Sequence, residues 1–315
     1  MNKKYLPSAL ILYLNYFIHG VGCSILGQAV IKEALAAAWG VEAMAITAIS
    51  AALGLGRLIA LPFAGPLSDK LGRRISTAIG SASYAIYLIG LALAFNAGTH
   101  GGYTIAYVCA IIGGIANSFL DTCVSPTCME IYVNNPSVAN LFTKFSMCIS
   151  QFLLPFLIGF VAAANMSYRT IFIVAGVAIF IDGILILFLP FPERNAAGAG
   201  AKKEKAKIKI TPAAFAAILI GFTSSSTFML WLNCNQELGK LYNLSDPAKI
   251  QSFYAVGTFA AILCSSVFIK KGLKEINILI IYPLISFIML GLCYFIQNPT
   301  ICLRSEEHTS ELQSH

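Results

Sequence analysis

Long apolar runs separated by short polar breaks dominate the pattern of this chain. A helix needs about 20 apolar residues to cross a hydrocarbon core about 30 Å thick. Nine runs have about this length: 6–30, 42–64, 75–97, 103–126, 139–163, 169–191, 211–235, 251–269 and 276–297. Because a backbone in lipid must satisfy its own hydrogen bonds, the pattern predicts nine transmembrane helices and an all-α polytopic membrane protein.

Composition supports the same class. The 315 residues are 57% hydrophobic and 11% charged, whereas a soluble domain has about one quarter of its residues charged. Such a chain cannot cover a surface in water, and it is neither a disordered chain nor a nucleic-acid binder. Nine cysteines occur without a C-x-x-C pair, so we expect packing cysteines, with no metal site and no cofactor.

The distribution of lysine and arginine predicts a cytoplasmic N-terminus in the plasma membrane. Basic residues concentrate at 3–4, 70–74, 194–209 and 270–274, which alternate connections place on one side of the membrane. The opposite side receives Lys32, Arg169, Lys240 and Lys249. Cytoplasmic segments carry the excess of positive charge. The first run is too long for a cleaved signal peptide and contains Asn15 and His19, so we expect it to be retained.

A basic stretch rich in alanine and glycine predicts a boundary between two halves. We expect four parts: a six-helix N-terminal half (1–192), a cytoplasmic linker (193–210), the first three helices of a second half (211–303) and a tail (304–315). Residues 4–9 and 209–214 form a weak repeat across the linker, as parallel repeats do in one large class of transporters. The polar tail resembles a translated sequencing adapter, and we expect it to be non-native.

The segment 65–74 reads Gly-Pro-Leu-Ser-Asp-Lys-Leu-Gly-Arg-Arg. It resembles the signature G-x-L-x-D-x-x-G-R-R/K of the major facilitator superfamily. The resemblance implies a twelve-helix fold, of which nine helices are present, and a monomeric secondary transporter rather than an enzyme. It also implies a gating role for six residues of the loop between the second and third helices: Gly65, Leu67, Asp69, Gly72, Arg73 and Arg74.

Physical roles for this gating motif follow from residue type. We expect Gly65 and Gly72 to allow sharp turns and close approach of helices. Asp69 would hold the cytoplasmic latch by meeting helix dipoles and basic groups. Arg73 and Arg74 would anchor the loop at the lipid headgroups.

Departures from the family pattern favour solute uptake. Drug–proton antiporters of the superfamily usually carry an arginine in the fourth helix and a Gly-Pro signature in the fifth, and this chain has neither at 103–126 or 139–163. Multidrug efflux remains the alternative within the fold. An intramembrane enzyme or sensor is the alternative from another class.

Three charged residues within spans are expected at one depth. Arg57, Asp121 and Lys144 each lie about five to seven residues from the cytoplasmic end of their runs, which is about 8–11 Å. Charges inside a membrane usually face a cavity and pair with one another. They predict either a structural ion pair or a site where Asp121 exchanges partners or protons. Asn117 shares a helical face with Asp121, and Gln151 shares one with Lys144.

Further polar residues are candidates for a solute or proton site. Asn15 and His19 share a face near the middle of the first run, where histidine is either a packing residue or a proton carrier. Asn233, Asn235 and Gln236 near the outer end of the seventh run suit a solute that bears hydroxyl or carboxylate groups. The sequence assigns no role to Asp182. We therefore expect a transporter of a sugar or organic acid, coupled to protons by Asp121 or His19.

The expected tail can be tested on the source DNA. We expect a longer reading frame that continues past Leu303 without residues 304–315, and a 315-residue product that is degraded or inactive when expressed. Sequencing the locus checks this. Genomic DNA that encodes the twelve tail residues and then a stop codon would contradict it.

Overall fold

The computed structural model describes residues 3–192, 211–241, 244, 246–270, 272 and 275–296, and these residues contain helices and no β-strand. Each of the nine predicted runs contains a helix, which confirms the all-α class. The predicted linker 193–210 and tail 304–315 lie outside the described residues. The α-helices are α1 (Leu6–Ser24), α2 (Ala29–Trp39), α3 (Ala43–Leu71), α4 (Arg73–Ala97), α5 (Gly102–Ile131), α6 (Pro136–Ala163), α7 (Arg169–Phe188), α8 (Pro212–Leu241), α9 (Lys249–Lys270) and α10 (Glu275–Ile296).

Six helices of the described part are long and apolar enough to cross a membrane, and all of them precede residue 192. They are α1 together with the turn that follows it, α3, α4, α5, α6 and α7. The chain thus has the six-helix N-terminal half expected from the sequence. The next helices, α8 to α10, have 30, 22 and 22 residues, which corresponds to about 33–45 Å.

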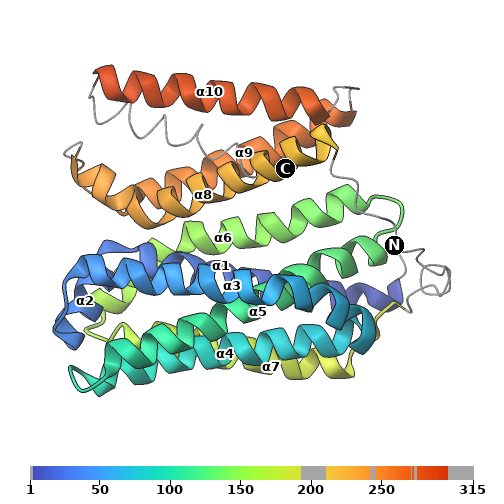
Figure 1. Cartoon of the computed structure of the whole chain (residues 1–315). Coiled ribbons are helices and arrows are strands. Elements are labelled where there is room, and N and C mark those ends of the chain that lie inside the picture. The colour runs from blue at the N-terminus through green and yellow to red at the C-terminus, as the bar shows by residue number, and fades with distance from the viewer. Residues whose placement is uncertain are drawn as a thin grey trace.

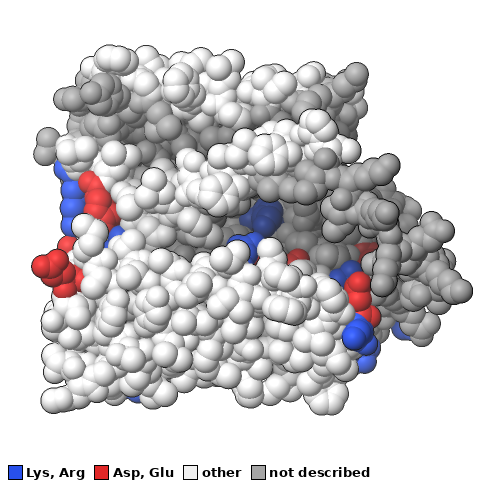
Figure 2. Space-filling view, in the orientation of Figure 1, with Lys and Arg blue, Asp and Glu red and all other residues white. Residues whose placement is uncertain are grey.

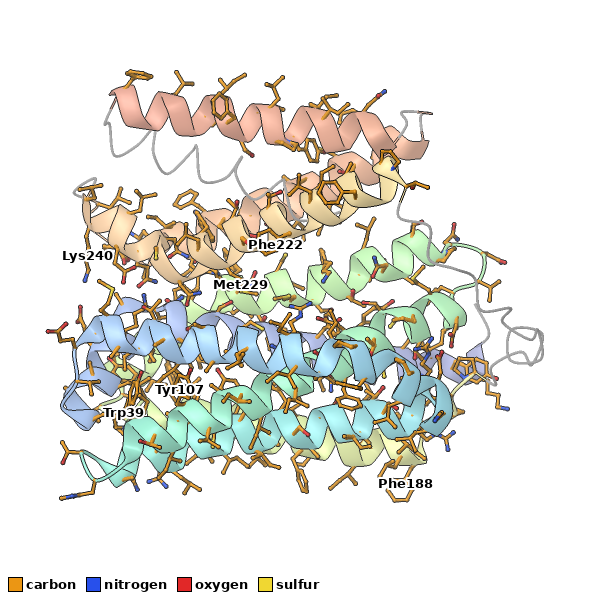
Figure 3. The ribbon with its side chains drawn as sticks, viewed as in Figure 1. Trp39, Tyr107, Phe188, Phe222, Met229 and Lys240 are labelled. Atoms are coloured by element: carbon orange, nitrogen blue, oxygen red, sulfur yellow. The ribbon has the colours of Figure 1, made fainter. Side chains whose placement is uncertain are left out.

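The helices lie side by side in two groups (Figure 1). One group holds α1 to α7, the other holds α8 to α10, and α6 packs against α9 between them. Trp39 and Lys240 mark one end of the bundle and Phe188 marks the opposite end (Figure 3). We call the end with Trp39 the α2 end. We call the opposite end the motif end, because the connection between α3 and α4 at Gly72 lies there.

The first predicted span is confirmed over Leu6–Gly27, but the run over 6–30 is interrupted near its end, at Gln28. After α1, a 3-10 turn (Ile25–Gly27) leads to an extended Gln28 with φ −76° and ψ 123°. The helix then resumes as α2 and continues to Trp39, where Gly40 ends it with φ +66°. Lys32, expected in a polar outer segment, is therefore on a helix and only 3% exposed.

The motif segment is helix rather than loop. The α3 helix continues through Gly65 and Pro66 to Leu71, because interior prolines are tolerated in membrane helices. Gly72, at φ +86°, is the single residue that links α3 to α4. The expected turn is confirmed at Gly72. The expected close approach is wrong at both glycines, since a Cβ atom there would meet no described atom within 4 Å.

A close crossing of α3 and α5 lies at Gly56 and Gly114. A Cβ atom on Gly56 would come within 2.0 Å of the Ile111 carbonyl oxygen, and one on Gly114 within 2.0 Å of the Leu53 carbonyl oxygen. Small residues permit this backbone contact between membrane helices. The Ser118 hydroxyl also donates to the Arg57 carbonyl oxygen (3.1 Å). The crossing fixes the backbone of Arg57 against α5.

Candidate functional site

An ion pair joins Arg57 of α3 to Asp121 of α5. The Arg57 Nη2 atom lies 2.6 Å from Asp121 Oδ2, and the two side chains are 42% and 22% exposed. The hydroxyl of Tyr16, on α1, donates to Asp121 Oδ1 (2.8 Å). Both oxygens of this carboxylate are thus engaged, one by a cation and one by a neutral donor. Charge-assisted hydrogen bonds of this kind are about twice as strong as neutral ones.

Lys144 of α6 joins the same neighbourhood through an aromatic ring. Its Nζ atom lies 5.7 Å from the centroid of the Tyr16 ring. A cation at this distance from an aromatic face is attracted by the ring quadrupole. The structure therefore gathers the three predicted charges around Tyr16, but it pairs only Arg57 with Asp121.

His19 and Asn117 form a second polar contact beside this cluster. The His19 Nε2 atom lies 2.7 Å from Asn117 Oδ1, and the imidazole packs edge-on to Tyr16 and Tyr84. Because a carbonyl oxygen only accepts, Nε2 carries the proton. The other ring nitrogen, Nδ1, is buried without a hydrogen-bond partner among the described residues. Gln151 is 2% exposed and donates to the Ser24 hydroxyl (3.0 Å).

Asn15 does not belong to this neighbourhood. Its Nδ2 atom donates to Ser81 of α4 (2.8 Å) and to Asp182 of α7 (2.6 Å). Asn15 is fully buried and Asp182 is 1% exposed. Asn15 and His19 both contact α4, at Ser81 and Tyr84, but the Asn15 side chain is bonded to Ser81 and Asp182 and not to the charge cluster. Asp182, which had no role, is a buried packing group between α1 and α7.

Charged side chains lie in a hollow between the two helix groups (Figure 2). Most of this face is uncharged, and the other charged side chains gather near its two ends. Hollows with convergent polar groups are the usual solute sites of proteins. In the part of the chain that the structure describes, no group of His, Cys, Asp and Glu is arranged to hold a metal ion.

Contacts between α2 and α8 join the two groups at the α2 end. Gln236 Oε1 accepts from the Ala29 backbone N–H (2.6 Å), and its Nε2 donates to Gln28 Oε1 (2.7 Å). Lys32 Nζ donates to the Asn233 carbonyl oxygen (2.5 Å) and to Glu237 (2.9 Å). We call these residues the α2–α8 contact.

The predicted residues of α8 thus lie away from the charge cluster. Gln236 and the backbone of Asn233 bind the first group, and the Asn233 side chain donates to Met229 of its own helix (2.7 Å). Asn235, 1% exposed, donates to Gln251 of α9 (3.1 Å). The structure does not bring these amides to Asp121.

The motif arginines bind protein groups. Arg73 donates to the Thr122 carbonyl oxygen of α5 (2.7 Å) and lies 3.5 Å from Glu130. The Thr122 carbonyl oxygen receives no helical hydrogen bond, because Pro126, four residues later, has no backbone N–H to donate. Arg74 packs over the Phe191 ring at 5.6 Å. Arg73 and Arg74 thus have protein contacts besides the headgroup anchoring expected of them, which stays a prediction. Leu67 and Asp69 are exposed at the motif end.

Sequence reasoning missed Tyr16, Gln28, Lys32 and Glu237. Tyr16 was one of many aromatic residues in apolar runs, and nothing in its spacing marks a bond to Asp121. Gln28 was a usable signal, since an amide inside an apolar run needs a partner. Lys32 was counted among the basic residues of the outer segments, and Glu237 was given no role.

The sequence profile of the Major Facilitator Superfamily matches residues 12–303. The chain belongs to this superfamily. It is 31% identical over 299 residues to the inner membrane transport protein YdiM of Escherichia coli, covering 92% of this chain and 72% of that protein. It is 27% identical over 311 residues to the uncharacterized MFS-type transporter YfkL of Bacillus subtilis, covering 96% and 76%. The chain is therefore a multi-pass membrane protein of a transporter superfamily.

Solved structures share the fold. A D-xylose–proton symporter matches with a TM-score of 0.72 and 17% identity, over 99% of this chain and 80% of that one. The fucose–proton symporter of Escherichia coli matches with a TM-score of 0.66 and 13% identity, over 99% and 83%. These matches confirm the fold expected from the motif at 65–74.

The α2–α8 contact of this superfamily member depends on Gly27. A Cβ atom there would come within 2.3 Å of the Leu232 carbonyl oxygen of α8. Gly27→Ala should therefore disfavour the closed contact by about 1–3 kcal/mol, the usual cost of overpacking, or about tenfold in its population. Cysteines introduced at positions 28 and 236 should therefore form a cross-link less readily in the Gly27→Ala protein than in the protein that keeps Gly27.

The matched control is Gly54→Ala, because a Cβ atom on Gly54 would meet no described atom within 4 Å. This variant should cross-link as efficiently as its parent. Equal cross-linking in the Gly27→Ala protein would show that the backbones do not need to touch there.

A packing role for Asn15 predicts a coupled effect with Asp182. Asn15→Leu leaves the buried carboxyl without its donor and should lower the free energy of unfolding by about 1–3 kcal/mol. Asn15→Leu with Asp182→Leu should recover most of this loss, because neither polar group then remains. The free energy of unfolding of the detergent-solubilised protein is measured for the wild type, the two single variants and the double variant. Additive losses would contradict the pairing.

Proposed function

We propose that the chain is a secondary active transporter that takes up a small polar or organic solute of the sugar or organic acid class, coupled to protons. The observation that carries this proposal is the Arg57–Asp121 pair with Tyr16, in which Arg57 and Asp121 are 42% and 22% exposed within the spans. Charged side chains also lie in a hollow between the two helix groups (Figure 2). A solute in that hollow can bias which end of the bundle is open. Alternating access by rocking of two halves works in this way.

Protonation of Asp121 supplies the coupling step of the proposal. A proton on Oδ2 neutralises the carboxylate and removes its attraction for Arg57, while Tyr16 can keep its bond to Oδ1. The released guanidinium then becomes a donor for solute oxygens. His19 is the second candidate carrier, because its Nδ1 atom is free to accept a proton.

The proposed orientation puts the N-terminus and the motif end in the cytoplasm and the α2 end outside the cell. Support comes from the basic residues at 3–4 and 70–74. With the α2–α8 contact formed, the structure corresponds to a state closed toward the outside. The relative YdiM is named as an inner membrane protein, which favours the plasma membrane as the location.

Transport assays in proteoliposomes test the proposal. The full-length protein should accumulate sugars or organic acids when the outside is acidic, and accumulation should stop when the proton gradient is collapsed. Accumulation that survives the collapse would contradict proton coupling. Export of apolar cations in exchange for protons would favour multidrug efflux instead.

Paired substitutions separate coupling from simple charge neutralisation. Asp121→Asn leaves Arg57 without its partner, at a cost of less than about 3 kcal/mol because Arg57 is 42% exposed. Asp121→Asn with Arg57→Met should restore expression. If Asp121 carries the proton, the double variant should still exchange solute across the membrane but should not accumulate it. Accumulation at the wild-type level would make the pair purely structural.

A surface pair supplies the control. Asp246 and Lys249 lie 3.9 Å apart with side chains 47% and 62% exposed, and exposed pairs contribute little to stability. Asp246→Asn with Lys249→Met should leave both exchange and accumulation unchanged.

A further inference from the structure

The charges around Tyr16 do not balance. Asp121 supplies one negative charge, and its two oxygens are taken by Arg57 and the Tyr16 hydroxyl. Lys144 supplies a second positive charge, 5.7 Å from the centroid of the Tyr16 ring. In the described parts of the chain, no carboxylate lies within ion-pair distance of Lys144.

Other carboxylates of the helices are already engaged. Glu130 pairs with Arg73 and Glu237 with Lys32. Asp182 is buried against Asn15 on the opposite side of α1. A half-buried ammonium in a membrane span is costly without a counter-charge, and such residues mark substrate pathways.

We infer that Lys144 binds the carboxylate of the transported solute, so that the substrate is an organic monoanion rather than a neutral sugar. This inference rests on the proposed function. While Asp121 is ionised and paired with Arg57, as in this structure, one positive charge is left over, and it matches one carboxylate. A phosphate ester carries about 1.5 to 2 negative charges at pH 7 and would leave an excess.

Ligand-induced stabilisation of the purified full-length protein tests the charge requirement. The probes are gluconate, lactate and benzoate as carboxylates, glucose and xylose as neutral solutes, and glucose 6-phosphate as the phosphate ester. A ligand that binds the folded state raises the melting temperature. We expect stabilisation by at least one carboxylate and none by the neutral sugars or the phosphate ester.

Substitutions of Lys144 locate the binding charge. Lys144→Met should weaken carboxylate binding about tenfold to a hundredfold, the usual effect of losing a charge-assisted hydrogen bond. It should not lower the melting temperature without ligand, because it removes an unpaired charge from the span. Lys144→Arg should keep most of the affinity. Lys249→Met, which removes an exposed lysine at the start of α9, should bind as the wild type does.

Each other outcome overturns the inference. These outcomes are stabilisation by glucose or xylose, stabilisation by the phosphate ester alone, no stabilisation by any carboxylate, and unchanged carboxylate affinity in Lys144→Met. Different results would contradict the proposed function and the monoanion inference. Proton-driven accumulation of glucose would keep that function and refute the monoanion, whereas carboxylate binding without proton-driven accumulation would keep Lys144 as the anion site and refute the coupling.

Discussion

A charge within a membrane span is costly without a partner, and this cost organises the centre of the protein. The Arg57–Asp121 pair lowers it only because α3 and α5 touch backbone to backbone at Gly56 and Gly114. Side chains at that crossing would push the helices apart and separate the ions. Tyr16 then completes the pair from α1. The helix crossing therefore supports the ion pair, because it holds the backbones of α3 and α5 close enough for Arg57 to reach Asp121.

The same cost shapes the α2 end. Lys32 is 3% exposed, and its ammonium group is held by Glu237 and by a carbonyl oxygen of α8. Reaching α8 requires a break in the first span, where the extended Gln28 exposes the Ala29 N–H to Gln236. The break has no proline. Contact with the second helix group satisfies the backbone donor that a continuous helix would have satisfied internally.

Much of the fold could be predicted from the sequence, because apolar runs report the length of a span directly. The gating motif and the common depth of Arg57, Asp121 and Lys144 could also be predicted. Hydropathy does not encode which polar groups meet, so the partners of Asn15 and Gln236 could not be derived. Pro66 suggested a loop where α3 continues for another turn, because rules for proline in water overstate its effect in a membrane helix.

The two kinds of polar contact differ in what a solute or proton could change. Asn15 and Asp182 are sealed between α1 and α7 within one helix group, so movement between the groups would leave them intact. The α2–α8 contact joins different groups, and such movement must break it. The Arg57–Asp121 pair lies within one group but is partly exposed, so a ligand can rearrange it without unfolding a helix. Coupling between a central ligand and a distant contact requires an element with two arrangements that both sites bias. The two helix groups provide that element, because contacts inside each group can persist while contacts between the groups exchange.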